Sequence, residues 1–166
     1  MRLAAIALSS LLLAGCATAP DRDGRLQPGI SRGEDVIAWH GQPRRVWPEA
    51  DGGRTLEYSS QPIGRHCYMI RFDAAGRLLG VTDGLSPASR ARIEPGMTPE
   101  QVSHILGGER SRVFFRLSGE DVWDWTIEPD QIGYGLRFNV HFKDGRVLRT
   151  SQSMVFPSRR FPGMDD

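Results

Sequence analysis

Residues 95–107, PGMTPEQVSHILG, carry the signals of a short amphipathic helix set between two glycines. Thr98 and Gln101 form a Thr-x-x-Gln capping box, with a proline in the first helical position. Three apolar residues then follow at i, i+3 and i+4, which places them on one helix face: Val102, Ile105 and Leu106. Gly107 supplies the left-handed conformation that ends a short helix. The stretch therefore predicts one short helix with a single buried face.

A second stretch of the same kind, PGISRGEDVIAWHG, occupies residues 28–41. Its signals are a Ser-x-x-Glu capping box, two apolar positions and a closing glycine: Ser31, Glu34, Val36, Trp39 and Gly41. One additional residue separates the cap from the valine in this copy. The recurrence predicts that the chain contains a duplicated unit.

The repetition continues into segments with strand periodicity. Residues 56–62, LEYSSQP, match residues 123–129, WDWTIEP, and residues 66–78 match residues 136–147. Four apolar residues alternate with polar ones, which is the period of a half-buried antiparallel strand: Leu136, Phe138, Val140 and Phe142. Asp-Gly at 144–145 is a strong signal for a tight hairpin. Each half is thus expected to hold a short helix and three or four antiparallel strands.

These units explain why the chain carries two copies. One amphipathic helix on a small sheet makes a thin core for about 65 residues, whereas two units can share a core or extend one sheet. We predict an α+β fold with two tandem helix-plus-antiparallel-sheet repeats, at residues 28–83 and 86–152. Residues 86–93 add a short helix before the second copy.

The first residues have the pattern of a secretory signal. An apolar stretch follows Arg2, and it is shorter than the roughly 20 residues that span a bilayer. Residues 13–16, Leu-Ala-Gly-Cys, resemble a bacterial lipobox, which predicts a signal peptide at 1–15 and lipid (palmitate) attachment at Cys16. An ordinary signal peptide with a chance cysteine is the alternative. Residues 16–27 are small and polar and are interpreted as a lipidated tether.

Charge and motif content exclude several functions. The chain has 21 basic and 20 acidic residues, and loss of Arg2 with the signal leaves 20 of each. A neutral chain is a poor partner for nucleic acid. The histidines and carboxylates show no metal-ligand spacing, and no glycine loop could hold a phosphate, so we expect no cofactor and no metal.

The sequence also gives little support to an enzyme. His66 and Cys67 are the one tempting pair, but neighbours on a strand point to opposite faces. His40 and His104 are interpreted as packing residues at helix boundaries. With Cys16 lipidated, Cys67 has no partner for an internal disulfide. We therefore predict that the protein is not an enzyme.

The downstream unit resembles a known family. PGMTPEQVSHILG, the tryptophan strand VWDWTI and the ending F-x-D-G-R-V are similar to the SmpA/OmlA (BamE-like) family of outer-membrane lipoproteins. The resemblance implies a lipid-anchored protein of the outer membrane that faces the periplasm and belongs with the β-barrel assembly machinery. The presence of two tandem units is more similar to the β-lactamase inhibitor protein architecture, which implies an inhibitor-like binder of a periplasmic enzyme as the alternative. We expect envelope proteins as partners.

The alternation of the strands predicts where a partner binds. Trp123 and Trp125 share one sheet face and are interpreted as core residues, with a ligand-stacking platform as the alternative. The opposite faces of the two sheets are expected to join into one open surface that carries Cys67 and these candidate contacts: Met69, Arg71, Arg137, Asn139 and His141. A merely solvated face is the alternative. Residues 153–166 are interpreted as a C-terminal tail.

Overall fold

The computed structural model describes residues 25–155, and Cys16 and the predicted signal peptide lie outside this range. The elements are α1 (Gly33–His40), β1 (Arg45–Pro48), β2 (Arg54–Ser59), β3 (Cys67–Phe72), β4 (Leu78–Asp83), α2 (Pro87–Arg90), α3 (Pro99–Leu106), β5 (Ser111–Phe115), β6 (Glu120–Ile127), β7 (Gly135–Lys143) and β8 (Arg146–Val155). Within the described range, no helix has the length and hydropathy needed to cross a bilayer.

The strands form two antiparallel sheets of four, each in sequence order. The first sheet has the order β1-β2-β3-β4 and the second the order β5-β6-β7-β8. Helix α1 belongs to the first unit and α3 to the second, while α2 lies at the junction. The predicted α+β fold with two helix-plus-sheet repeats is confirmed.

The strand register is the same in both units. Tyr58 pairs with Tyr68 across β2 and β3, and Trp125 pairs with Phe138 across β6 and β7. A β-bulge follows Arg71 in β3, and another occupies the corresponding place after His141 in β7. The alignments predicted from the sequence therefore hold in three dimensions: Leu56 with Trp123, Tyr58 with Trp125, and Phe72 with Phe142.

The two helices also end in the same way. Gly41 after α1 and Gly107 after α3 have φ angles of 78° and 76°. The Tyr58 hydroxyl donates a hydrogen bond of 2.7 Å to the Gly41 carbonyl, and the Trp125 indole N–H donates one of 3.2 Å to the Gly107 carbonyl. Each helix end is therefore held by an aromatic side chain from the second strand of its own sheet.

The predicted cap of the first helix is wrong by one residue. The N-cap is Arg32, whose backbone N–H donates to the Asp35 carboxylate at 2.8 Å, while Ser31 accepts from the Gln27 N–H in the preceding turn. With Arg32 as the cap, the distance from cap to valine equals that in α3, where Thr98 and Gln101 form the predicted capping box. The apparent extra residue therefore lies before the helix.

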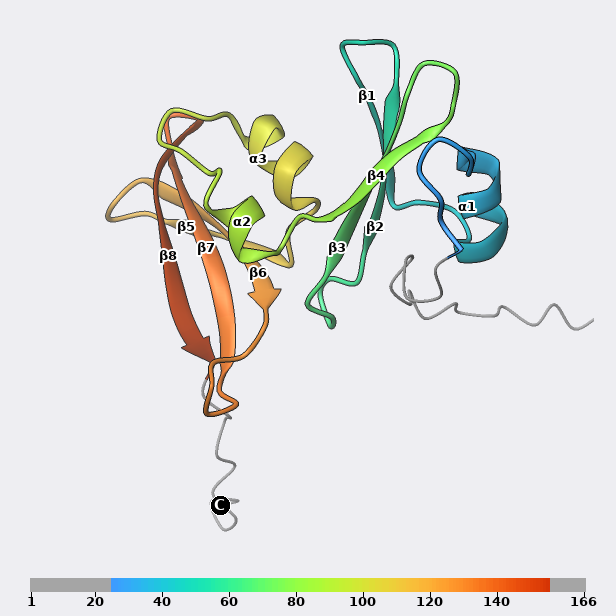
Figure 1. Ribbon diagram of the computed structural model, residues 1–166. Coiled ribbons are helices and arrows are strands. Elements are labelled where there is room, and N and C mark those ends of the chain that lie inside the picture. Colours follow the sequence, from blue (N-terminus) through green and yellow to red (C-terminus); the bar gives the residue numbers. More distant parts are fainter. Residues whose placement is uncertain (1–24, 156–166) are drawn as a thin grey trace, which may run out of the picture.

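The elements stack in four layers, as Figure 1 shows. Helix α1 covers one face of the first sheet, α3 with α2 lies between the two sheets, and the second sheet closes the other end. The sequence of layers is helix, sheet, helix, sheet. The units therefore stack head to tail, so that α3 meets both its own sheet and the back of the first one.

Two apolar clusters follow from this arrangement. A smaller one lies between α1 and the first sheet and includes Val36, Leu56 and Phe72. A larger one is centred on α3 and combines residues of both sheets, including Trp47, Met69 and Trp125. Trp123 and Trp125 are 5% and 0% exposed, so their interpretation as core residues is confirmed.

Three local predictions need correction. Trp39 was expected on the buried face of the first helix, but it is 46% exposed because α1 has only one neighbouring layer. Strand β8 extends to Val155, so the segment interpreted as a tail from residue 153 begins inside the sheet. The helix expected in residues 86–93 is confined to the four residues of α2.

Candidate functional surface

The seam between the two units is organised around a buried carboxylate. Glu57 in β2 is 0% exposed, and its carboxylate accepts hydrogen bonds from the Trp47 indole N–H at 3.1 Å and the Gly108 backbone N–H at 2.9 Å. A buried charged group is tolerated when it is well hydrogen-bonded. Glu57 of the first unit thus binds the segment that follows helix α3 of the second.

The approach of the units at this seam requires glycine. A Cβ placed at Gly107 would lie 2.1 Å from the Cys67 Sγ atom, whereas a Cβ at Gly41 would meet nothing within 4 Å. Cys67 is 0% exposed, and burial raises the pKa of its thiol well above the ordinary value. The thiol therefore has a packing role and is not poised for reaction.

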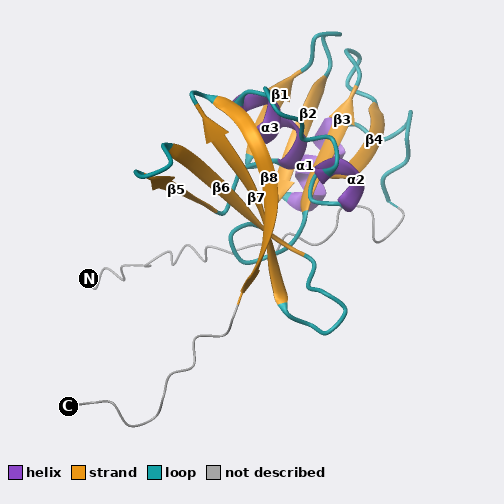
Figure 2. Ribbon diagram, turned by 90° about the vertical axis from the view of Figure 1, so that its left-hand side faces the viewer, coloured by secondary structure: helices purple, strands orange, loops and turns teal. Residues whose placement is uncertain are grey.

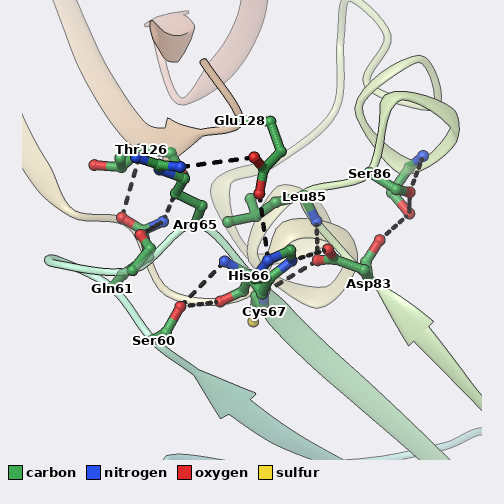
Figure 3. A network of polar contacts seen from close by, with 12 residues as sticks. Ser60, Gln61, Arg65, His66, Cys67, Asp83, Leu85, Ser86, Thr126 and Glu128 are labelled. Carbon is green, nitrogen blue, oxygen red and sulfur yellow. Dashed lines mark hydrogen bonds and ion pairs between the residues drawn. The ribbon is translucent and has the colours of Figure 1, made fainter. Parts of the chain in front are cut away.

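A second polar bridge joins the units beside the seam (Figure 3). The Gln61 side chain donates to the Thr126 carbonyl at 2.8 Å and accepts from the Thr126 N–H at 3.1 Å. His66 Nδ1 lies 2.7 Å from the Asp83 carboxylate, and its Nε2 lies 3.3 Å from Glu128 of the second unit. His66 and Cys67 point to different surroundings, as their neighbouring strand positions predict.

The seam overturns the prediction of one open surface across both units. Cys67 and Met69 are 0% and 7% exposed because helix α3 covers that face of the first sheet. Arg71 is exposed at the end of the covered region, where its guanidinium binds the Asp51 carboxylate at 2.8 Å. It lines a groove of about 180 Å³ together with Arg92 and His104. The structure therefore separates Met69 and Arg71 from the candidate residues of the second unit.

The candidate residues of the second unit do lie together. Figure 2 looks onto the outer face of the second sheet, and the helices all lie behind that sheet. Strand alternation and register place one set of residues on this outer face: Val113, Phe115, Glu120, Val122, Asp124, Arg137, Asn139, His141, Arg149 and Ser151. Arg137, Asn139 and His141 are half-buried among these neighbours.

His141 is the centre of one network on this face. Its Nδ1 lies 2.7 Å from the Glu120 carboxylate, and its Nε2 lies 2.9 Å from the Ser151 hydroxyl and 3.1 Å from the Arg149 guanidinium. Because a guanidinium can only donate, the contact with Arg149 makes Nε2 the acceptor, and Nδ1–H is then the donor to the Glu120 carboxylate. Arg149 also donates to Glu120 at 2.9 Å. The His141 hydrogen bond and the Arg149 charge hold the pKa of the Glu120 carboxyl below its ordinary value.

A second network surrounds Asp124. The Arg110 guanidinium donates to the Asp124 carboxylate at 2.5 and 3.1 Å, and the Ser111 hydroxyl is also bonded to it. Arg137 lies 3.8 Å from the same carboxylate. By register, Asp124 corresponds to Glu57, the carboxylate at the seam of the first unit. In the second unit the carboxylate at this position binds two arginines of its own unit, Arg110 and Arg137.

Sequence reasoning missed the apolar border of this face. Val113 and Phe115 in edge strand β5 are 49% and 51% exposed, and Val122 of β6 lies beside them. Phe114 and Leu117 are also exposed, on the other side of the strand and in the following turn. The signal was the run RVFFRL at 112–117, whose apolar residues lie on an edge strand that pairs with one neighbour only.

Comparisons with known proteins give structural likeness alone. No protein-family model and no curated protein matches the chain, so the SmpA/OmlA resemblance rests on its motifs. A proposed β-lactamase inhibitor protein from Streptococcus mutans is similar in structure, with 9% identity, 78% of this chain and 91% of that chain covered, and a TM-score of 0.31. A DUF4309 family protein from Bacillus subtilis shows 16% identity, covers 79% of this chain and 83% of its own length, and has a TM-score of 0.29.

Proposed function

We propose that the protein is a lipid-anchored, non-enzymatic binding module of the bacterial envelope, which serves as an accessory factor in outer-membrane protein assembly. The observation that carries the binding role is the outer face of the second sheet, which carries Arg137, His141 and Arg149 on β7 and β8 and exposed apolar residues on edge strand β5. Arginine and aromatic residues are the types enriched in protein interfaces. Helix α3 already covers the outer face of the first sheet, whereas the outer face of the second sheet is open to a partner.

The anchor in this proposal is Cys16, supported by the sequence LAGC at the end of the apolar run. Lipid at this residue would place the folded units on the periplasmic side of the outer membrane, behind the tether of residues 16–27. Cys16→Ser is expected to abolish lipid attachment, which intact-mass analysis of the membrane fraction would detect. An unmodified mature N-terminus in the wild type would contradict the anchor without affecting the binding surface.

The binding role is tested by purification from membranes in mild detergent. The wild type is expected to recover envelope proteins, and the double variant Arg137→Gln and Arg149→Gln to lose them while its melting temperature stays within a few degrees. Arg54→Gln with Arg77→Gln removes the same charge from exposed positions of the first unit and serves as the control. Barrel-assembly subunits among the recovered proteins would support the assembly role, and a soluble periplasmic enzyme would favour the inhibitor-like alternative.

A further inference from the structure

The seam shows how this fold covers the outer face of one of its own sheets. Helix α3 lies over the back of the first sheet, and edge strand β1 supplies contacts to it. The Trp47 ring meets the His104 ring edge-on at 5.1 Å, and the Glu49 carboxylate lies 3.2 Å from His104 Nε2. The outer face of a sheet in this protein is therefore a surface that accepts a helix.

The second sheet presents the same positions uncovered. Because β1 pairs with β2 in the same register as β5 with β6, each helix-contacting residue of β1 has a counterpart in β5. Trp47 is 7% exposed, whereas its counterpart Val113 is 49% exposed. Glu49 directly follows β1, and continuing the register by one residue gives Phe115 as its counterpart, which is 51% exposed. These two edge-strand positions, which contact a helix in the first unit, are thus apolar and exposed in the second.

The charge beside these positions limits what can lie there. The outer face carries three arginines, Arg110, Arg137 and Arg149, against two carboxylates, Asp124 and Glu120. Arg149 keeps a side chain that is 51% exposed although it is paired with Glu120. An occupant with acidic side chains is favoured over a basic one because unlike charges across an interface select the partner.

We propose that the outer face of the second sheet binds an amphipathic α-helix of a partner protein, as the first sheet binds α3. The apolar stripe of the helix lies over Val113, Phe115 and Val122, and its acidic residues meet Arg137 and Arg149. The inference deepens the proposed binding function by naming the chemistry of the partner, and it rests on that function.

The test uses the full-length protein in detergent and three labelled peptides, with binding followed by fluorescence anisotropy. The first peptide is a designed amphipathic helix with leucines at i, i+3, i+4 and i+7 and glutamates along both borders. The second replaces the glutamates by lysine, and the third carries a central proline that breaks the helix. The acidic helix is expected to bind at least about tenfold more tightly than either of the others.

Variants of the protein test whether the acidic peptide binds to the outer face of the second sheet. Val113→Ser with Phe115→Ser is expected to weaken binding of the acidic helix at least about tenfold, because buried apolar anchors dominate such contacts. Phe114→Ser is the matched control, since it removes an exposed phenylalanine from the same strand but on the opposite side. Its binding is expected to equal that of the wild type. All three changes are at exposed positions, and a thermal melt checks the fold.

Several results would overturn the proposal. Equal binding of the proline peptide would mean that β5 pairs with an extended strand, and equal binding of the lysine peptide would remove the role of the arginines. Concentration-dependent association in analytical ultracentrifugation that Phe115→Ser abolishes would assign the face to a second copy of the chain. Failure of the acidic helix to bind, with partner loss still seen in the Arg137→Gln and Arg149→Gln variant, would refute the helix and leave the proposed function standing.

Discussion

At the scale of single residues, the contact between the two units depends on Gly107 and Glu57, neither of which can be replaced by a similar residue without loss of a contact. Gly107 gives both a left-handed backbone and room for the Cys67 sulfur, and Glu57 uses a fully buried carboxylate to hold the Gly108 N–H. Gly41, at the corresponding place in the first unit, meets only the conformational demand. Comparing substitutions at Gly41 and Gly107 therefore separates the destabilisation due to backbone conformation from the destabilisation due to steric contact with Cys67.

Gly107→Ala is expected to destabilise the protein more than Gly41→Ala. Both substitutions place a side chain in a backbone region that is essentially limited to glycine, which costs about 1–3 kcal/mol. The alanine at Gly107 must also displace Cys67, which adds about 1–3 kcal/mol. Urea unfolding followed by circular dichroism measures both values. Equal losses for the two variants would mean that the seam relaxes to accept the methyl group.

Cys67 is expected to resist alkylation in the folded protein. Burial raises the pKa of the thiol, so the reactive thiolate is scarce at pH 8 and the sulfur is out of reach of reagent. Iodoacetamide at pH 8 should leave Cys67 unmodified in buffer and modify it fully in denaturant, as read by peptide mass spectrometry. Rapid labelling of the native protein would show that the seam opens readily.

At the scale of the elements, two helices with similar sequences have different surroundings. Helix α3 lies between two sheets and buries Val102, Ser103 and Leu106, whereas α1 lies on one sheet and buries Gly33 and Val36. Their closing glycines are equivalent, and in both helices the backbone N–H of the cap residue donates to the side chain three residues on. The difference arises from stacking, because the second unit supplies a layer that the first helix lacks.

Leu106→Ala is expected to lower the free energy of unfolding by about 2–5 kcal/mol, as for other buried large-to-small changes. Leu106 is 0% exposed within the large apolar cluster. Leu117→Ala is the control, because that side chain is fully exposed and should change stability by no more than about 0.5 kcal/mol. Thermal melts of the two variants measure this difference. A Leu106→Ala variant with the melting temperature of the wild type would contradict the burial of this side chain.

At the scale of the whole molecule, the outer faces of the two sheets differ in character. The first sheet presents Trp47, Cys67 and Met69 to the next helix, whereas the corresponding positions of the second sheet hold Val113, Arg137 and Asn139. Terminal units of stacked repeats commonly carry a polar outer face. The second sheet has a polar outer face of this kind, with an apolar border on β5 that suits a partner.

The shared cluster predicts that the two units unfold together. Glu57→Ala removes the acceptor for Trp47 and Gly108, and leaving buried donors unpaired costs about 1–3 kcal/mol. Hydrogen exchange should then accelerate in both sheets, with one transition by circular dichroism and tryptophan fluorescence. Two separate transitions, or protection lost in the first sheet alone, would show that the units are energetically independent.

The sequence by itself determined the local structure of each unit. Capping residues, apolar spacing and closing glycines depend on neighbours a few residues apart, so α3, the strand faces and the tandem repeat could be predicted from Thr98, Gln101 and the alternation at 136–142. The polar half of the candidate surface, Arg137, Asn139 and His141, followed from the same alternation.

Only the tertiary structure decided how the units stack, and therefore which sheet face is covered by a helix and which is exposed. Alternation shows that Met69 and Arg137 occupy corresponding faces, but not that α3 covers the first and leaves the second open. That choice depends on long-range contacts, chiefly Glu57 with Gly108 and Cys67 beside Gly107, which lie 51 and 40 residues apart in the chain. Patterns among neighbouring residues cannot predict such pairs, because these contacts stabilise the protein only after both units have folded and packed together.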